Sequence, residues 1–373
     1  MKRASLFPLL WTLLCVVCLS CEKKVPTPLP EEEGISEFPH IMVFFPPNGP
    51  GDNGYLDKMM AAVARFSIAH PGILQIVQTT EANTDSLGGS MLLPLLDMIT
   101  MDETKQDTTL AVFIGSEFKE ILYQSEAPEG KLKVLLLEDD GAGAPEWLHT
   151  CLVERYGASY LAGAMVAQQR AIIIAAMPRE PVLEKQIAGF IKGYGSIKGR
   201  EVESVYYLAN DYRGFTMQAK ARAIVDSIQQ SNMIDYYTVF PLAGAANMGA
   251  YCGLYEATFM QAIGMDNDYS SLSDNIPFSI DIRVDVILQE YLEQWHATQQ
   301  LPKRRIEGLD SKYVEIVFNA TWNSTELFFD WEDENQNWDY EDWDIVLTSE
   351  FWKQRYDLFI DKAIEEEKAY AKY

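Results

Sequence analysis

From His40 onward, short apolar runs alternate with amphipathic stretches, and this alternation constrains the fold of the chain more than any other feature. The first run is residues 41–45, and a loop of Pro, Gly, Asp and Asn follows it. The next stretch carries apolar residues at helical spacing, which predicts a helix with one buried face. These residues are Leu56, Met59, Val63 and Phe66. Such alternation is typical of βα units that build a parallel sheet, so we expect an α/β fold.

The apolar runs fall into two consecutive series, so we expect two α/β halves, each with its own sheet. The first series is residues 41–45, 73–77, 110–114 and 134–137, and the second is residues 171–176, 205–208 and 236–240. Two further runs, at 276–281 and 313–318, are expected to return the chain between the halves. Because open α/β sheets bind ligands at the carboxyl ends of their strands, two such lobes predict a cleft between them.

These runs give predicted boundaries for the whole chain. Residues 39–155 with 282–311 are expected to form lobe 1, and residues 156–281 are expected to form lobe 2. Residues 312–373 are expected to hold a return strand, an acidic aromatic insertion at 330–344 and a closing helix at 351–370. The acidic spacing of the insertion loosely imitates a calcium loop. Trp338 stands where that loop requires a glycine for its tight turn, so we favour a solvated insertion.

The first twenty residues resemble a bacterial lipoprotein signal peptide. Lys2 and Arg3 precede an uncharged apolar run at 4–19, and a small residue stands just before Cys21. The resemblance implies that residues 1–20 are cleaved off, that the sulfur of Cys21 is acylated, for example with palmitate, and that the lipid anchors the chain in the bacterial cell envelope.

The segment after the cysteine fits a tether. Residues 21–38 are rich in proline and glutamate and hold too little apolar area to form a core. An ordinary signal-anchor helix is the alternative, because roughly 17–25 apolar residues can span a bilayer. Cys18 also departs from the lipoprotein pattern, which usually has an aliphatic residue at that place.

The acidic composition limits the partners. Against 30 Lys and Arg, the chain has 55 Asp and Glu, which gives a formal net charge of −25. Nucleic acid is excluded, because binding phosphates requires clustered cations and the chain has no basic block beyond residues 303–305. The four histidines are scattered, and the sequence has no GxSxG, P-loop or dinucleotide-binding motif. We therefore expect no metal and no cofactor.

Two cysteines remain after the signal region. Cys151 and Cys252 are too far apart in sequence to form a zinc site or a redox CxxC pair. They could form a disulfide in an oxidising compartment. The favoured interpretation is that both are small buried apolar residues.

Five segments carry motifs in one order along the two predicted lobes. Residues 154–163 read Glu-Arg-Tyr-Gly-Ala-Ser-Tyr-Leu-Ala-Gly, and residues 51–55 read Gly-Asp-Asn-Gly-Tyr. Residues 181–193 contain Pro-Val and Gly-Phe, residues 243–249 begin with Ala-Gly and end with Gly, and residues 263–268 read Ile-Gly-Met-Asp-Asn-Asp. In this order the segments resemble the basic membrane protein family, the substrate-binding lipoproteins of nucleoside importers.

The resemblance implies a two-lobed periplasmic-binding-protein-like fold of type I, in which hinge-crossing strands join the lobes and the lobes close on a purine nucleoside. The chain would then be a monomer without enzymatic activity, with an ABC permease as partner. Asp266 occupies the position that takes the ribose in the family, and Tyr55 the position of a base-stacking Trp. The other residues expected to bind the ligand are Asp52, Asn53, Gly115, Ser116, Glu117, Gly244 and Asn247.

Two positions depart from the family and leave the ligand open. Ile282 stands where the family has a lysine that helps to hold the ligand, and the adjacent Arg283 need not point the same way. Gln186 stands where the family has a phenylalanine. The ligand could therefore be another nucleoside or a sugar.

Simpler interpretations of the same residues also remain. The Gly-Asp-Asn-Gly loop could be an ordinary turn, and Asp266 could cap a helix. Glu154 and Arg155 could pair with each other or cap a helix at a hinge. Tyr160 and Leu161 are expected to pack, because the small residues around them suit a close helix crossing.

Three classes of function therefore stay open. Capture of a solute by hinge closure is the leading one. An enzyme that cleaves glycosides would need paired carboxylates, for which Asp139 with Asp140, or Asp266 with Asp268, are the candidates. A surface interaction protein would use the acidic, aromatic segment at 330–344 to bind a protein or glycan.

Overall fold

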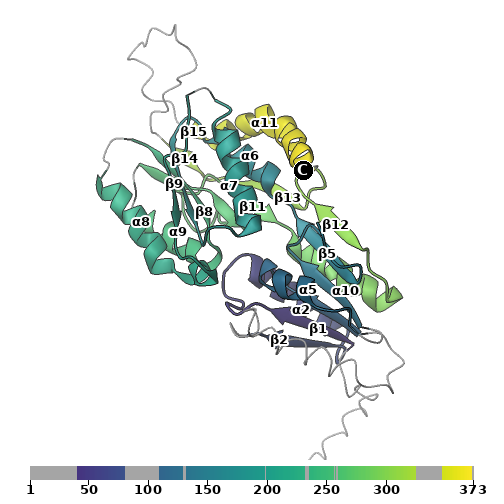
Figure 1. Ribbon diagram of the computed structural model, residues 1–373. Coiled ribbons are helices and arrows are strands. Elements are labelled where there is room, and N and C mark those ends of the chain that lie inside the picture. Colours follow the sequence, from purple (N-terminus) through teal and green to yellow (C-terminus); the bar gives the residue numbers. More distant parts are fainter. Residues whose placement is uncertain are drawn as a thin grey trace, which may run out of the picture. The chain divides into compact units, whose positions relative to one another are not determined.

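The computed structural model describes residues 40–79, 109–128, 132–197, 199–231, 235–255, 257, 259–324 and 347–371. The predicted signal peptide, Cys21, the tether and the acidic insertion at 330–344 lie outside these residues. From Pro39 onward the chain forms one compact unit. It contains two parallel sheets with their helices, here called lobe 1 and lobe 2, and a small sheet between them (Figure 1).

Lobe 1 contains a six-stranded parallel sheet in the order β12-β5-β4-β3-β1-β2. Its strands are β1 (Ile41–Phe45), β2 (Leu74–Gln78), β3 (Thr109–Phe113), β4 (Leu132–Leu137), β5 (Leu148–Val153) and β12 (Arg304–Glu307). Its helices are α2 (Tyr55–Ala69), η1 (Ser116–Phe118), α5 (Lys119–Gln124) and α10 (Val284–Thr298).

Strand β1 shows how the sequence places a helical layer on each face of this sheet. Ile41, Val43 and Phe45 belong to the hydrophobic core that includes residues of α2 and α10. Met42 and Phe44 belong to a second core that includes residues of η1 and α5. Because successive side chains of a strand point to opposite faces, a strand between two helical layers must be apolar at every position.

Lobe 2 contains a four-stranded parallel sheet in the order β7-β6-β8-β9. Its strands are β6 (Arg170–Ala175), β7 (Ser204–Tyr207), β8 (Tyr237–Leu242) and β9 (Met260–Ala262). Its helices are α6 (Tyr156–Met165), α7 (Pro181–Tyr194), η2 (Tyr212–Thr216), α8 (Gln218–Ser231), η3 (Gly244–Ala246) and α9 (Asn247–Gly253).

Helices α6 and α7 cross so closely that side chains are excluded between their backbones. A Cβ atom on Gly193 would lie 2.7 Å from the carbonyl carbon of Tyr160, and its oxygen would be closer still. A Cβ atom on Gly163 would lie 2.8 Å from the amide nitrogen of Tyr194. The predicted close helix crossing around Tyr160 and Leu161 is confirmed, and both of these side chains are buried.

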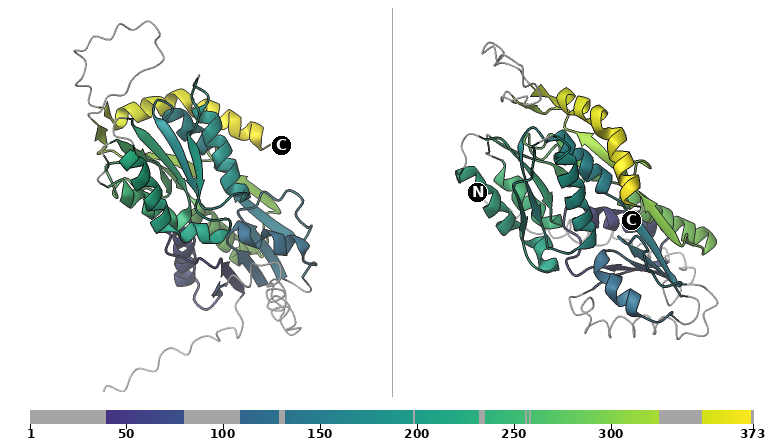
Figure 2. Two further views of the ribbon diagram at one scale, coloured as in Figure 1. Left: turned by 60° about the vertical axis from the view of Figure 1, so that its left-hand side comes forward. Right: turned by 45° about the horizontal axis from the view of Figure 1, so that its top comes forward.

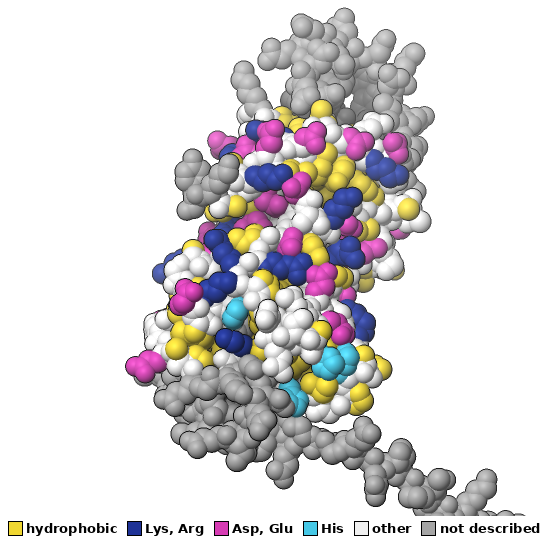
Figure 3. Space-filling model, turned by 90° about the vertical axis from the view of Figure 1, so that its right-hand side faces the viewer, with side chains coloured by type: hydrophobic (Ala, Val, Ile, Leu, Met, Phe, Trp, Pro, Cys, Tyr) yellow, Lys and Arg dark blue, Asp and Glu magenta, His cyan; other side chains and the backbone are white. Residues whose placement is uncertain are grey.

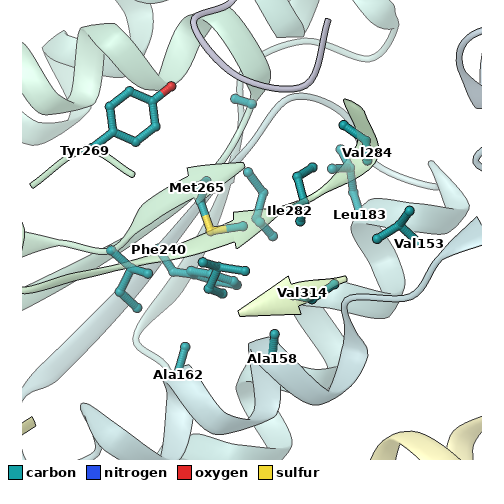
Figure 4. Close-up of a cluster of buried hydrophobic side chains, with 14 of the residues drawn as sticks. Val153, Ala158, Ala162, Leu183, Phe240, Met265, Tyr269, Ile282, Val284 and Val314 are labelled. Carbon is teal, nitrogen blue, oxygen red and sulfur yellow. The ribbon is translucent and has the colours of Figure 1, made fainter. Parts of the chain in front are cut away.

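The chain passes between the lobes three times, from β5 to α6, from β11 to α10 and from β12 to β13. The crossing sheet consists of β10 (Gly264–Asp266), β11 (Phe278–Ile282) and β13 (Val314–Phe318), with β11 in the middle. Met265, Ile282 and Val314, one from each strand, gather with Phe240 of β8 in one apolar cluster (Figure 4). This cluster ties the crossing strands to the core of lobe 2.

The last helix, α11 (Ser349–Tyr370), lies along α6 (Figure 2). Side chains of α11 form hydrogen bonds with backbone groups at both ends of α6. The carboxylate of Glu367 accepts hydrogen bonds from the amides of Gly157, 2.9 Å away, and Leu309, 2.9 Å away. Arg355 donates to the carbonyl oxygens of Ala164, at 3.0 Å, and Met165, at 2.6 Å. These contacts supply partners for helix-end groups that lack intrahelical ones. The predicted closing helix at 351–370 is confirmed.

The structure confirms the predicted strands of both series and the two returning strands, each within two residues at either end. Six described strands, β5, β9, β10, β12, β14 (Asn323–Ser324) and β15 (Leu347–Thr348), lay outside the prediction, and the last two form a small antiparallel sheet of their own. Strand β12 reads Arg-Arg-Ile-Glu and is half exposed at the edge of its sheet, so it carries no continuous apolar run. Strands β9 and β10 have three residues each, which is too few to show an apolar run or an alternating pattern in the sequence.

The prediction for the cysteines is wrong in part. Both thiols are free, so no disulfide joins them, and Cys151 is buried whereas Cys252 is exposed. Among the described residues, none of the helices combines the length and the apolarity needed to cross a membrane. On the face drawn in Figure 3, acidic and basic side chains intermingle without a block of one sign.

A candidate ligand-binding cleft between the lobes

A cavity lies where the carboxyl ends of the strands of both lobes meet. Its empty volume is about 720 Å³, counting space that is open to solvent. Residues that follow β1, β3 and β4 line it from lobe 1, and residues that follow β6 and β8 line it from lobe 2. Open α/β sheets bind ligands at this end of their strands.

Seven of the nine predicted ligand-binding residues line this cavity. They are Asp52, Tyr55, Gly115, Ser116, Glu117, Gly244 and Asp266. Asn53 and Asn247 do not line it, and both are held by turn contacts instead. The carbonyl of Asn53 accepts a hydrogen bond from the hydroxyl of Tyr269 at 2.8 Å, and the side chain of Asn247 accepts one from the amide of Ala243 at 2.8 Å.

Asp52 serves as a backbone partner at the start of α2. Its carboxylate accepts hydrogen bonds from the amides of Gly54 at 2.9 Å, Leu56 at 2.9 Å and Asp57 at 3.1 Å. Burial raises the pKa of Asp52 in spite of these three donors. The turn interpretation of this loop therefore fits the contacts of Asp52, whose oxygens already have donors.

A buried ion pair spans the base of the cavity. Arg155 donates two hydrogen bonds to Glu138, at 2.7 and 3.0 Å, and the two side chains are only 4% and 8% exposed. Glu138 follows β4 and Arg155 precedes α6, so the pair joins lobe 1 to the first crossing of the chain. The alternative in which Arg155 pairs through its side chain with Glu154 is wrong, because the carboxylate of Glu154 accepts from backbone amides and from Lys185.

Asp266 ends β10 and borders the cavity close to Arg155. The separation between Arg155 Nε and Asp266 Oδ1 is 3.9 Å, which is an ion pair without a hydrogen bond. Burial raises the pKa of Asp266 to about 6, and the charge of Arg155 opposes that rise. The helix-cap alternative does not fit, because Asp266 ends a strand rather than preceding a helix.

Two carboxylates from opposite lobes form a third feature of the lining. Glu180 caps α7, where it accepts a hydrogen bond from the amide of Leu183 at 2.7 Å, and it also accepts one from the hydroxyl of Ser116 at 2.6 Å. Glu117 is adjacent to Ser116. Burial raises its pKa to about 8, and the nearby charges of Glu180 and Glu138 add to this rise.

Three buried polar atoms in the lining have no hydrogen-bond partner within the described chain. They are the hydroxyl of Tyr55, Nε of Arg155 and Oε1 of Gln186. Most buried polar atoms in folded proteins have a partner, so an unpaired set around one cavity needs an explanation.

Strained backbone gathers around the same cavity. Among the described residues, Glu138 and Asp266 line it with φ angles of 64° and 69°, and Asn53 and Arg179 stand next to lining residues with φ angles of 55° and 63°. Left-handed conformations of residues other than glycine cost free energy and tend to cluster at functional sites. Only two further residues of this type, Gln299 and Lys312, occur in the described chain.

Fourteen lining residues were not among the predicted ones, and five of these have charged or aromatic side chains: Glu138, Arg155, Glu180, Tyr212 and Phe215. Tyr212 and Phe215 lie on η2 with their rings stacked at a centroid distance of 6.1 Å. Glu138 could have been found, because it follows a predicted strand directly, as the segment with Glu117 does. The others depend on contacts across the chain that no local pattern reveals.

Contacts across the cleft hold the lobes together. Ser116 of lobe 1 donates to Glu180 of lobe 2, and Lys185 of α7 donates to Asp140, which follows β4, at 3.2 Å. These two hydrogen bonds join the lobes at the edge of the cavity.

The carboxylate pairs considered for the enzyme alternative do not both line this cavity. Asp139 lies outside the lining and accepts hydrogen bonds from Lys119 and Tyr123, both at 2.6 Å. Asp268 is exposed and accepts from the amide of Ser270 at 2.9 Å. A pair of carboxylates that flank a bound glycoside is therefore absent at these two positions.

Solved structures share this architecture. A solute-binding protein of an ABC transporter system from Aeropyrum pernix K1 is 16% identical, with a TM-score of 0.60 and coverage of 89% of either chain. A transcriptional activator of the comK gene from Bacillus halodurans is 14% identical, with a TM-score of 0.57 over 86% of this chain and 97% of that chain. A periplasmic solute-binding protein from Actinobacillus succinogenes 130z with bound D-allose is 13% identical, with a TM-score of 0.55 over 76% of this chain and 98% of that chain.

These likenesses establish the fold and confirm its prediction: two α/β lobes of the periplasmic solute-binding type, with parallel sheets flanked by helices. Neither a protein-family model nor a curated protein matches the sequence. Membership of the basic membrane protein family therefore remains a prediction.

Proposed function

We propose that this chain is a lipid-anchored substrate-binding protein that captures a small polar solute between its lobes, for uptake or sensing. The unpartnered polar atoms of the cleft, on Tyr55, Arg155 and Gln186, are the observation that carries this proposal. A buried polar atom without a partner costs free energy, which a bound solute with hydrogen-bonding groups would offset. The fold supports the same function, because its lobes can open and close about the crossing strands.

A purine nucleoside is the first candidate ligand. Tyr55 and Phe215 offer aromatic rings to a planar base, and the carboxylate of Asp266 offers an acceptor to ribose hydroxyls. The resemblance to the basic membrane protein family supports this ligand.

A monosaccharide is the second candidate, and two positions favour it. Ile282, at the place of the family's ligand-holding lysine, is fully buried in the crossing sheet and offers no polar group. Gln186, at the place of a phenylalanine, brings an unpartnered amide oxygen to the cavity instead of a ring. The neighbour with bound D-allose supports this alternative.

Thermal unfolding of residues 22–373 with single ligands tests the proposal. We expect adenosine, guanosine or inosine, or else a monosaccharide such as D-allose, to raise the midpoint of unfolding. A ligand at 100 times its Kd adds about 2.7 kcal/mol to the free energy of unfolding. In Asp266→Asn the shift should shrink strongly, because the amide lacks the charge that strengthens hydrogen bonds from hydroxyl groups. Asparagine tolerates the left-handed backbone of this position.

The matched control is Asp268→Asn, two residues away and exposed outside the cavity. This variant should keep the full shift. No response of the wild-type midpoint to any nucleoside or monosaccharide would overturn the proposed function. A full shift in Asp266→Asn would leave solute binding in place and remove the role given to Asp266.

Attachment to the membrane through Cys21 is a separate part of the proposal. In the full chain, Cys21→Ser should abolish acylation, because serine has no thiol. The variant should then appear either in the soluble fraction or in the membrane fraction with its signal peptide uncleaved. Cys18→Ser is the matched control and should leave the protein in the membrane fraction. Mass spectrometry of the N-terminal peptide would show the acyl groups, and an unmodified Cys21 in membrane-bound wild type would contradict this assignment.

A further inference from the structure

The charges of the cleft lining are strongly unbalanced. Arg155 is the only cationic side chain among the described residues of the lining, which otherwise carry five carboxylates. These are Asp52, Glu117, Glu138, Glu180 and Asp266. An anionic solute would meet repulsion here, because like charges at short range oppose each other strongly in a partly buried site.

Two of the carboxylates are already compensated. Arg155 neutralises Glu138 through two hydrogen bonds. Asp52 accepts from three backbone amides at the beginning of α2, where the helix dipole favours a negative charge.

The other three carboxylates, those of Glu117, Glu180 and Asp266, have fewer hydrogen-bond donors or cations to compensate their charge. Glu180 has the hydroxyl of Ser116 and backbone amides at the beginning of α7. Asp266 has the distant Nε of Arg155 and the charge of Lys58, and neither cation donates a hydrogen bond to it. Glu117 has no cationic partner among the described residues, and its only hydrogen bond is to its own backbone amide. The cleft therefore holds its least compensated carboxylate where the two lobes meet.

The local backbone is shaped to hold Glu117 in this place. Gly115 has φ 117° and ψ 151°, a conformation open to glycine almost alone. A Cβ atom on Gly115 would lie 3.1 Å from Cδ of Glu117, and one carboxylate oxygen would be closer still. The carboxylate thus folds back over Gly115, with Glu180 and Glu138 nearby and no cation between them.

Two other groups near Glu117 could bind a positively charged hydrogen-bond donor. Tyr212, on the other lobe, lies close enough to Glu117 and Glu180 to feel both charges, and aromatic faces attract cations. Oε1 of Gln186, whose residue is 4% exposed, faces the same cavity and can only accept a hydrogen bond.

We propose that the natural solute carries a protonated amine, which binds Glu117 and Glu180 from the two lobes at once. This inference rests on the proposed function and narrows its ligand to an amino-substituted nucleoside or an amino sugar. An amine between the two carboxylates would balance the excess charge and join the lobes. Burial raises the pKa of Glu117 to about 8, so this side chain is largely protonated near pH 7, and binding of a protonated amine to its carboxylate would release that proton.

Two matched series of probes test the inference by isothermal titration calorimetry at pH 7. One series is adenosine, 5′-amino-5′-deoxyadenosine and adenosine 5′-monophosphate, and the other is D-glucose, D-glucosamine and D-glucose 6-phosphate. In at least one series the amine should bind about tenfold tighter than its neutral parent, and the phosphate should bind weakest. Titration in two buffers with different ionisation enthalpies should report proton release for the amine.

Two variants show where the preference arises. Glu117→Gln should lose both the preference for the amine and the proton release, and Glu120→Gln should keep both. Glu120 is exposed on the neighbouring helix and outside the cavity. Neutral parents that bind as tightly as the amines would overturn the inference and leave the proposed function standing. If no probe binds the folded wild type, both are overturned.

Discussion

Arg155→Met is expected to lower the free energy of unfolding by about 3–5 kcal/mol, because it leaves Glu138 as a buried charge without a partner. Arg155 and Glu138 are 4% and 8% exposed and share two hydrogen bonds. No other cation lines the cavity among the described residues, so none is placed to replace the guanidinium. Urea unfolding at pH 7, with an unchanged dependence on denaturant, would measure the loss.

A variant at an exposed ion pair tests whether the large loss of stability depends on the burial of the Arg155–Glu138 pair. Arg65→Met removes an ion pair with a single hydrogen bond, 2.9 Å from Arg65 to Asp285, between side chains that are 49% and 26% exposed. This change should cost less than about 1 kcal/mol, as exposed pairs usually do. Adding Glu138→Gln to Arg155→Met should recover part of the large loss, since no unpaired charge then remains. Equal losses in Arg155→Met and Arg65→Met would contradict the role assigned to the buried pair.

The fold was predictable because its strands are apolar on both faces. Residues 41–45 and 110–114 stand out as continuous apolar runs since helices cover the sheet on either side. The same reasoning fails for β12, where half-exposed arginines at a sheet edge break the run. Edge strands need no apolar pattern, and their pairing depends on a partner far away in sequence, here β5.

Much of the cleft was predictable from topology. Gly115, Ser116 and Glu117 follow β3, and the parallel arrangement brings such segments to one edge of the sheet. Asn53 was expected beside them, but it lies outside the lining, has φ 55° and accepts a hydrogen bond from Tyr269 through its backbone carbonyl. Residue type alone could not distinguish these two outcomes.

The pairing of Glu138 with Arg155 was not predictable from the sequence. The two residues are on different elements, and Glu138 adopts a left-handed conformation that glutamate rarely takes. The strain is tolerated because the bidentate contact and the surrounding core fix the residue. A prediction from local backbone propensity would therefore not place Glu138 in the left-handed conformation that it adopts at this site.

Gly193→Ala is expected to destabilise the protein by about 3 kcal/mol or more, at the upper end of the usual cost of overpacking. The new Cβ would meet the backbone of Tyr160, with the carbonyl carbon at 2.7 Å and the Cα at 2.9 Å. A backbone carbonyl cannot rotate out of the way as a side chain can, so α6 and α7 would have to separate. The free energy of unfolding in urea measures the effect directly.

Gly195→Ala is the matched control at the end of the same helix. Its φ is −74°, and a Cβ atom there would lie 3.2 Å from the carbonyl oxygen of Ile191, so alanine needs a shift of only a few tenths of an ångström. Here the change should be neutral or stabilise by up to about 1 kcal/mol, because alanine has less freedom than glycine in the unfolded chain. A Gly193→Ala variant as stable as Gly195→Ala would contradict the close helix crossing.

The Gly193→Ala variant should also bind solute more weakly, because α7 carries two groups of the cleft. Glu180 stands at its beginning and Gln186 in its second turn, while Arg155 immediately precedes α6. Separation of the two helices would therefore move Glu180 and Gln186 relative to Arg155, and hydrogen bonds weaken steeply with distance and angle. Calorimetry on the folded fraction should show reduced affinity, whereas Gly195→Ala should bind as the wild type does. Unchanged affinity in a destabilised Gly193→Ala variant would mean that the crossing supports the fold without positioning the cleft.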